Sequence, residues 1–142
     1  MTVDPRRVLG IDLGRVRIGL ALSDPLRMTA QPLGRIPRGA PRVDLERIAK
    51  LVDEREVAEV VVGHPLLLSG EHGDGARDAE AYAARLKGEL PCAVHLWDER
   101  LTTVQARRAL IEGNVRRSRR REVVDAAAAT LMLQSWLDAQ PR

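Results

Sequence analysis

The stretch that decides the fold is VLGIDLGRVRIGLAL, residues 8–22. It holds two short apolar runs, Val8–Leu13 and Ile18–Leu22, separated by the turn Gly14–Arg17. Two strands joined by so short a turn can pair only as an antiparallel hairpin. Asp12 interrupts the first run, and a carboxylate on an apolar strand must be paired, hydrogen-bonded or bound to a metal ion. The stretch therefore predicts a β-hairpin that carries one buried acidic residue.

Beyond the hairpin, the pattern alternates between strands and helices. A third extended segment over 29–36 contains Pro32 and is followed by Pro37, which suits an edge strand or a strand end. Residues 64–74 contain Pro65, Gly70 and Gly73 and are expected to form a flexible loop that extends to Gly75. The remaining pattern predicts strands over 60–63 and 92–97, and helices over 44–57, 76–87, 102–112 and 123–137. This order predicts one mixed sheet with helices on its faces, although it leaves the strand order open.

Length and composition restrict the class of protein. The 142 residues correspond to a single domain over 1–142, and 44% hydrophobic with 30% charged residues is a globular composition. No apolar run approaches the roughly 18 residues of a membrane span, and the N-terminus lacks the apolar core of a signal peptide. Cys92 is the one cysteine, which excludes an intramolecular disulfide and disfavours a cysteine-based zinc site. These features predict a cytoplasmic protein without a membrane partner.

The charges are distributed unevenly along the chain. Residues 1–42 and 100–142 each carry a net charge of +5, whereas residues 43–99 carry −7. If the two ends meet in the fold, they form a basic face that attracts polyanions such as nucleic acid. Chance segregation of charge in a small domain is the alternative. Phenylalanine is absent and the only aromatic residues are Tyr82, Trp97 and Trp136, so base-stacking platforms are not expected.

Acidic residues stand at three places where a solvated charge is not expected. Asp12 lies within the first strand, Asp98 and Glu99 end a predicted buried strand, and Asp125 precedes four alanines on the last helix. Each could be a helix cap, a strand-end charge or the partner of an arginine. Together, on elements that could converge beside the first strand, they indicate a site. Carboxylates without cysteine select hard cations such as Mg²⁺ or Mn²⁺, and two such ions can activate water and stabilise the leaving oxygen of a phosphodiester.

At these residues the sequence resembles the YqgF/RuvX family of Holliday junction resolvases, whose members are also described as nucleases of pre-16S ribosomal RNA. Four segments carry the resemblance: GIDLG at 10–14 continuing to Asp24, VVGHP at 61–65 with Gly70, DERLTT at 98–103 with Ala106, and VDAAAA at 124–129 extended to Leu137. The resemblance implies an α/β, RNase H-like fold, with a five-stranded mixed sheet whose first three strands are antiparallel, flanked by helices.

The same resemblance implies which residues form the site. Asp12, Glu99 and Asp125 would be both catalytic residues and ligands of two Mg²⁺ or Mn²⁺ ions, and Asp98 would orient the turn. One departure stands out. After VVG the family usually has Leu-Pro followed by a polar run, whereas this sequence has His64-Pro65 followed by apolar residues. His64 could contact a phosphate, carry a proton or be a solvated side chain. His72 and His95 offer weaker cases.

Arginines near these carboxylates are candidates for nucleic-acid binding. A basic segment before the last helix holds five arginines in six residues, which suits an exposed loop that a phosphate backbone would neutralise. A solvated linker is the alternative. Arg17 and Arg100 flank the acidic residues and could hold a phosphate or pair with Asp24 and Asp98, respectively. The full set of candidates is Arg17, Arg100, Arg116, Arg117, Arg119, Arg120 and Arg121.

The predicted function is that of a metal-dependent endonuclease of structured nucleic acid, acting either in 5′-end processing of pre-16S rRNA or on branched DNA in Holliday junction resolution. Symmetric cleavage of a junction would require a homodimer. The alternative is a nucleic-acid-binding protein without catalysis. A phosphotransferase or ATPase of the actin and sugar-kinase type would need a second domain to close over its nucleotide. The sequence leaves open the substrate, the cleavage position, the preferred metal and the oligomeric state.

Overall fold

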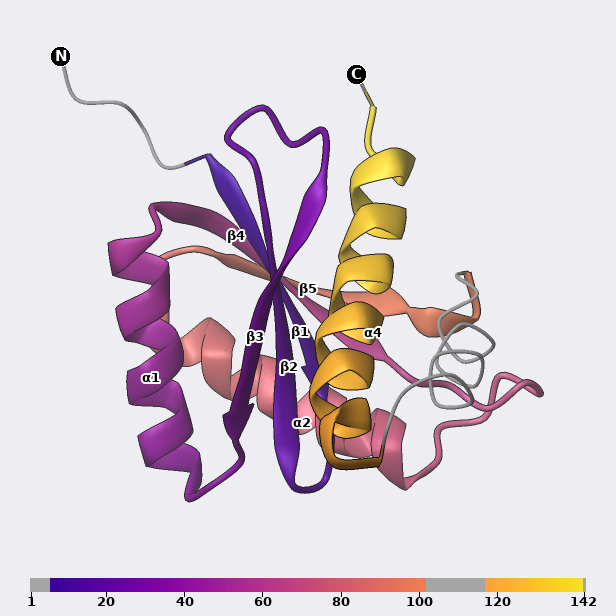
Figure 1. Cartoon of the computed structure of the whole chain (residues 1–142). Helices are drawn as coiled ribbons and strands as arrows, with labels where there is room; N and C mark the ends of the chain where they lie inside the picture. Colours follow the sequence, from indigo (N-terminus) through magenta and orange to yellow (C-terminus); the bar gives the residue numbers. More distant parts are fainter. Residues whose placement is uncertain (1–5, 102–116, 142) are drawn as a thin grey trace, which may run out of the picture.

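The computed structural model describes residues 6–101 and 117–141, without the side chains of residues 101 and 117–125. Within these described residues, five strands and three α-helices follow one another in the order expected from the hairpin outward (Figure 1). The elements are β1 (Arg7–Leu13), β2 (Arg17–Ser23), β3 (Ala30–Pro37), α1 (Pro41–Glu54), β4 (Val57–His64), α2 (Asp74–Glu89), β5 (Ala93–Asp98), the short 3-10 helix η1 (Glu99–Leu101) and α4 (Arg117–Ala139).

The strands form one mixed sheet in the order β3-β2-β1-β4-β5, with β1 at its centre. The hairpin pairs β1 with β2 in antiparallel register, and β3 extends the antiparallel half. On its other side β1 pairs with β4 in parallel, and β4 pairs in parallel with β5. The five-stranded mixed sheet with an antiparallel start is therefore confirmed. β3, with its two prolines, lies at the edge, where a missing backbone N–H is tolerated.

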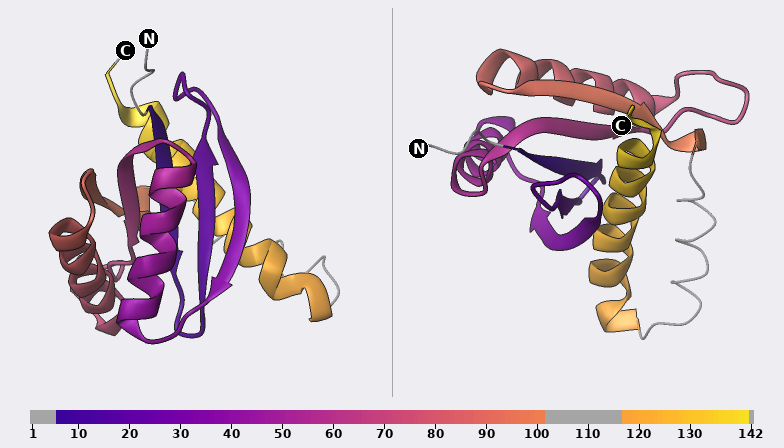
Figure 2. Two further views of the ribbon diagram at one scale, coloured as in Figure 1. Left: turned by 90° about the vertical axis from the view of Figure 1, so that its left-hand side faces the viewer. Right: turned by 90° about the horizontal axis from the view of Figure 1, so that it is seen from above.

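Helices cover both faces of the sheet, and each face has its own apolar core. α1 and α2 lie on one face, over alternate residues of β1 and β4 that include Leu9 and Ile11. α4 lies on the opposite face and packs mainly on β1, β2 and β3 (Figure 2). There Gly10 allows close approach, because a methyl group in its place would lie 2.9 Å from the Cβ of Leu133. The face under α4 is the one that receives the acidic residues.

Polar side chains fix α4 and the β2–β3 connection at the far end of the sheet. The Gln134 side chain accepts a hydrogen bond from the Ala30 backbone N–H (2.9 Å) and donates one to the Met28 carbonyl (3.1 Å). Ser23 accepts a hydrogen bond from the Val8 N–H at 2.8 Å. Asp24 accepts hydrogen bonds from three backbone N–H groups of residues 26–29, and the one from Thr29 contributes most to lowering its pKa. These family-motif residues therefore have structural roles.

Several expected boundaries were wrong. α1 ends at Glu54 rather than at Val57, because Glu56 adopts a left-handed φ of 55° that stops the helix and starts β4. α2 begins at Asp74, so the loop is shorter than expected. The basic segment is not a loop from Arg117 onward, because Arg117–Arg121 already belong to α4. Arginine is a good helix former, and each like-charge pair on a helix costs only a few tenths of a kcal/mol. The helix expected over 102–112 lies outside the described residues.

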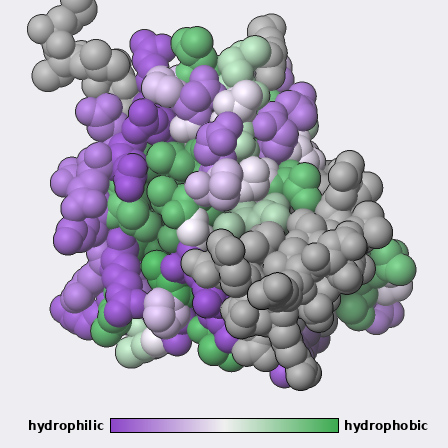
Figure 3. Space-filling view, viewed as in Figure 1, coloured by the Kyte–Doolittle hydropathy of each residue, from purple (hydrophilic) through white to green (hydrophobic). Residues whose placement is uncertain are grey.

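The fold brings the described parts of the two basic ends together, which is the condition for the basic face that the charge pattern left open. α4 lies against the strands of the N-terminal hairpin, whereas the acidic middle third supplies α1, β4, α2 and β5. The outer surface of α1 forms a hydrophilic side of the molecule (Figure 3). Among the helices of the described residues, none is long and apolar enough to cross a membrane.

Candidate active site

Asp12 lies near the carboxyl end of the central strand, on the sheet face that α4 covers. Alternate residues of a strand point to the same face, and Val8 and Gly10 of β1 both lie against α4. Asp12 continues this row, opposite Gly19 of β2. It is only 8% exposed, which is unusual for a carboxylate. The first predicted site residue is thus buried at a strand end, as the sequence suggested.

Glu99 follows β5 directly, as the first residue of η1, and is also 8% exposed. Its carboxylate reaches back over the neighbouring strand β4. A methyl group in place of the Gly63 hydrogen would lie 2.6 Å from Glu99 Oε1, so the side chain occupies the space above this glycine. The parallel register pairs Ile11 with Val62, which places Asp12 and Gly63 one step further along adjacent strands. Asp12 and Glu99 therefore lie on the same face and at the same end of the sheet.

Asp98 and Arg100 shape the turn that presents Glu99. The Arg100 backbone N–H donates to Asp98 Oδ1 at 2.9 Å, and its guanidinium donates to Oδ2 at 2.7 Å. The hydrogen bonds from Arg100 lower the pKa of Asp98 and raise the pKa of Arg100. Asp98 therefore orients the turn, in agreement with the weaker role expected for it. Arg100 is the structural partner of Asp98, one of the two roles left open for it.

Arg17 lies at the same end of the strands as Asp12. It opens β2, two residues before Gly19 on the strand that pairs with β1, and it is half-buried. The alternative pairing of Arg17 with Asp24 is wrong, because these residues lie at opposite ends of β2. The position of Arg17 at this end of the sheet is compatible with the phosphate contact expected for it.

The remaining candidates of the C-terminal segment lie on α4 or before it. Asp125 belongs to α4, one helical turn before Ala129, whose carbonyl approaches Gly10 of the central strand. Arg117, Arg119, Arg120 and Arg121 belong to the first turns of the same helix. The side chains of these five residues, and all of Arg116, lie outside the described part of the structure.

The histidines form contacts that sequence reasoning missed. His64 Nε2 and His72 Nδ1 both lie against Glu80 Oε2, at 2.9 and 2.7 Å. These two hydrogen bonds lower the pKa of Glu80, with His72 contributing more. His64, His72 and Glu80 are named the His–Glu cluster below. His64 is thus not a solvated side chain, because its side chain is only 13% exposed and is paired with Glu80. His95 instead contacts Glu59 at 3.0 Å.

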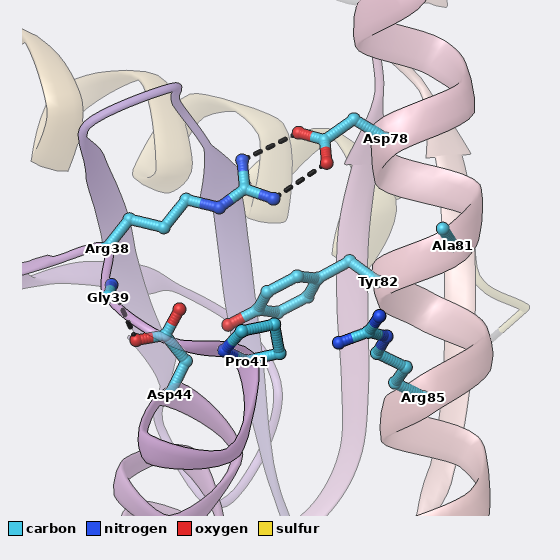
Figure 4. Close-up of a pocket in the computed structure, with 8 residues that line it drawn as sticks. All are labelled: Arg38, Gly39, Pro41, Asp44, Asp78, Ala81, Tyr82 and Arg85. Carbon is cyan, nitrogen blue, oxygen red and sulfur yellow. Dashed lines mark hydrogen bonds and ion pairs between the residues drawn. The ribbon is translucent and has the colours of Figure 1, made fainter.

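A separate polar pocket of about 120 Å³ lies on the other face of the sheet, between α1 and α2 (Figure 4). Arg38 closes it through two hydrogen bonds of 2.6 and 2.7 Å to Asp78. Tyr82 lies beneath the guanidinium, and burial together with the charge of Asp44 raises the pKa of its hydroxyl. This pocket joins β3 to α2 and faces away from Asp12 and Glu99, so it is not the candidate active site.

Comparisons with known proteins agree with this fold. A solved structure of Thermus thermophilus RuvC in complex with a Holliday junction substrate has a TM-score of 0.59 and 16% sequence identity, with 94% of each chain covered. At this identity the likeness concerns the fold alone, which is RNase H-like.

Other relatives share a much higher sequence identity with this chain than RuvC does. A protein of Nocardia farcinica is 50% identical over 139 residues, which cover 93% of this chain and 77% of the relative. A protein of Pelotomaculum thermopropionicum is 48% identical over 137 residues, which cover 96% and 89% of the two chains. Both are described as "Putative pre-16S rRNA nuclease". The family model described as RuvX, Holliday junction resolvase, matches residues 6–139, and this chain therefore belongs to the RuvX family.

Proposed function

We propose that this protein is a metal-dependent endonuclease that hydrolyses phosphodiester bonds of structured nucleic acid. The observation that carries the proposal is the burial of Asp12 and Glu99 at the carboxyl ends of strands on either side of Gly63. On one face and at one end of the sheet, the two carboxylates offer the oxygen donors that a hard divalent cation binds. Asp125, on the helix that crosses this face, is proposed as the third acidic residue.

The residues present fit a hard divalent cation. The donors are carboxylate oxygens, which Mg²⁺ and Mn²⁺ prefer. The absence of a side chain at Gly63 leaves room for the Glu99 carboxylate above β4. Asp12, Glu99 and Asp125 would hold the ions. Such ions, when bound, would supply activation of a water molecule and stabilisation of the leaving oxygen of a phosphodiester.

The surrounding residues position these carboxylates and the substrate. The Asp98–Arg100 hydrogen bonds fix the turn from which the Glu99 side chain extends over β4. Arg17 lies at the same end of the strands as Asp12, where it would hold a phosphate of the nucleic-acid backbone. The basic residues at the start of α4 would guide the polyanion toward an otherwise acidic centre. Since all these contacts are to phosphates, they supply affinity and orientation rather than sequence preference.

We propose a structured RNA, the precursor of 16S rRNA, as the substrate. Relatives at 48–50% identity are described by that activity, whereas the RuvC structure with a junction shares only 16% identity. Branched DNA is the competing substrate, which the description of the family suggests. Symmetric cleavage of a junction would need two copies of this centre, one for each strand.

The test is cleavage in the presence of Mn²⁺ by the wild type and by Asp12→Asn. Substrates are a pre-16S rRNA fragment, a four-way DNA junction and plain duplexes of RNA and of DNA. The matched control is Asp53→Asn, which removes an equal charge from an exposed position on α1. We expect the wild type and Asp53→Asn to cleave the RNA fragment, and Asp12→Asn to bind it without cleaving.

Each outcome has a defined meaning. Cleavage of the junction alone would transfer the proposal to branched DNA. Cleavage by Asp12→Asn at the wild-type rate would show that this acidic residue has no part in the mechanism. Binding of nucleic acid without cleavage by the wild type would favour a binding protein without catalysis.

A further inference from the structure

The His–Glu cluster brings two imidazoles and a carboxylate together from three parts of the chain. His64 ends β4, His72 lies in the loop that follows, and Glu80 lies in the second turn of α2. One ligand atom from each residue lies within 4.8 Å of the other two. We propose that the His–Glu cluster binds one divalent transition-metal ion of the Zn²⁺ type, at a site separate from Asp12 and Glu99.

The donor set selects this class of ion. Two imidazole nitrogens and one carboxylate oxygen leave a fourth, open position, a common arrangement for Zn²⁺. Imidazole suits Zn²⁺, Co²⁺ and Ni²⁺, whereas Mg²⁺ prefers oxygen alone. The two proposed sites would therefore take different ions in the same protein. Mg²⁺ and Mn²⁺ suit the carboxylates of the active site, and Zn²⁺ suits the His–Glu cluster.

The observed distances are close to those of a coordinated ion. With metal–ligand bonds of about 2.0–2.1 Å, tetrahedral ligand atoms lie roughly 3.3 Å apart. The two nitrogens lie 2.9 and 2.7 Å from Glu80 Oε2, so each contact has to open by less than about 1 Å. The two imidazole rings are 5.3 Å apart and nearly perpendicular, so they do not block each other.

Burial is graded across the cluster in a way that suits entry of an ion from solvent. The His64 side chain is 13% exposed, at the base of the loop, whereas the His72 side chain is 52% exposed. An ion would enter past His72 and be held against the end of β4. Binding would pin the loop over 65–73 between β4 and α2. Gly70 of this loop lies against the Arg100 guanidinium, so the pinned loop borders the turn that presents Glu99.

The test is titration of the chelator-treated full chain with Zn²⁺ by calorimetry, and with Co²⁺ by visible absorption, which reports tetrahedral nitrogen ligation. We expect one ion per chain in the wild type. His72→Ala and Glu80→Gln each remove a direct ligand, so we expect a loss of affinity greater than the roughly 10–100-fold that outer-sphere partners contribute. His72 is exposed, so its replacement leaves the fold intact, as circular dichroism would verify.

Two controls separate this site from the others. His95→Gln removes a histidine outside the cluster while keeping a hydrogen-bonding side chain beside Glu59, and it should bind Zn²⁺ like the wild type. Asp12→Asn removes a proposed active-site ligand and should also bind Zn²⁺ normally. Hydrogen exchange over 65–73 should slow on addition of Zn²⁺ in the wild type but not in His72→Ala.

Unchanged Zn²⁺ affinity in His72→Ala and Glu80→Gln would overturn the proposal. Loss of Zn²⁺ binding in Asp12→Asn but not in His72→Ala would also overturn it, by assigning the ion to the acidic residues. Neither result depends on nuclease activity, so the proposed function and this metal site can fail independently.

Discussion

Gly63 of β4 lies directly beneath the carboxylate of Glu99, and a methyl group at this glycine would lie 2.6 Å from Glu99 Oε1. The approach joins two strands, because Glu99 follows β5 and its carboxylate extends over β4 toward the row that contains Asp12. A glycine in the interior of a sheet usually weakens a strand, and one reason to keep it is close approach by another group. Here the approaching group is a proposed metal ligand.

Gly63→Ala is therefore expected to reduce cleavage strongly while leaving the protein folded. The new methyl group displaces the end of a flexible side chain, so the cost to stability is small. A displacement of about 1 Å at a catalytic group can lower the rate roughly 100-fold. Single-turnover cleavage in Mn²⁺, together with thermal unfolding of the variant, measures both effects.

Gly88→Ala is the matched control for this prediction. A methyl group at Gly88 in α2 meets no atom within 4 Å, so the substitution adds the same group without a clash. It should stabilise the protein by about 0.5–1 kcal/mol through the better helix propensity of alanine and leave cleavage unchanged. Equal activity of Gly63→Ala and Gly88→Ala would show that the position of the Glu99 carboxylate is unimportant.

The sequence predicted the sheet well because its signals are local. The hairpin follows from two apolar runs and a four-residue turn. The edge position of β3 is one of the two positions that Pro32 and Pro37 favoured. The strand order could not be derived from connection lengths, since several parallel arrangements satisfy them. The helix boundaries were wrong where a single backbone angle decides, as at Glu56.

The burial of two candidate site residues was predicted from the sequence. Asp12 and Glu99 could be recognised because carboxylates within apolar strands require an explanation. The role of Gly63 could not be predicted. The sequence does not show which side chain packs over this glycine until the β4–β5 register is known. The His–Glu cluster was missed because its three residues are 8 and 16 positions apart, and only the loop geometry brings them together.

Asp98 and Arg100 are expected to act as one unit. Asp98→Ala removes the acceptor of both the Arg100 backbone N–H and its guanidinium, which frees the turn and lowers cleavage. If Arg100 serves only to hold Asp98, the double variant with Arg100→Ala loses no more activity than either single variant. Cleavage rates of the four proteins form the required cycle. An additive loss, with weaker RNA binding in Arg100→Ala alone, would instead assign a phosphate contact to Arg100.

The Arg38–Asp78 pair predicts a pH dependence of stability. The hydrogen bonds and charge of Arg38 lower the pKa of Asp78 below its usual value of 3.8. The unfolded chain therefore binds a proton at Asp78 more readily than the folded protein does. The free energy of unfolding rises with pH between the pKa of the folded state and that of the unfolded state. The contribution is complete above the unfolded pKa and is lost as the pH falls through the lower pKa of the folded state. For a partly exposed pair it amounts to about 0.5–1 kcal/mol.

Urea unfolding of the wild type and Asp78→Asn between about pH 3 and pH 7 measures this contribution. The difference between the two proteins should be constant above about pH 5 and shrink below pH 4. Asp53→Asn, at an exposed position of α1, should show no such convergence with the wild type. A difference that stays constant to the lowest pH would mean that Arg38 does not perturb Asp78.

The basic start of α4 is expected to determine the salt dependence of nucleic-acid binding. Replacing Arg119, Arg120 and Arg121 with alanine removes three charges from a helix that lies on the same face as Asp12 and Glu99. Each phosphate that these arginines no longer neutralise should reduce the slope of log affinity against log salt by about 0.9 for a duplex, or about 0.7 for a single strand. Binding to the pre-16S rRNA fragment is measured over a series of salt concentrations.

The matched control removes three charges from the opposite face of the sheet. Arg42, Arg47 and Lys50 are exposed on α1, and their replacement by alanine changes the net charge by the same amount. A reduction of slope specific to the α4 variant would place the phosphate backbone along the helix that carries Asp125. Equal reductions in both variants would mean that net charge, rather than a defined path across the active site, attracts the nucleic acid.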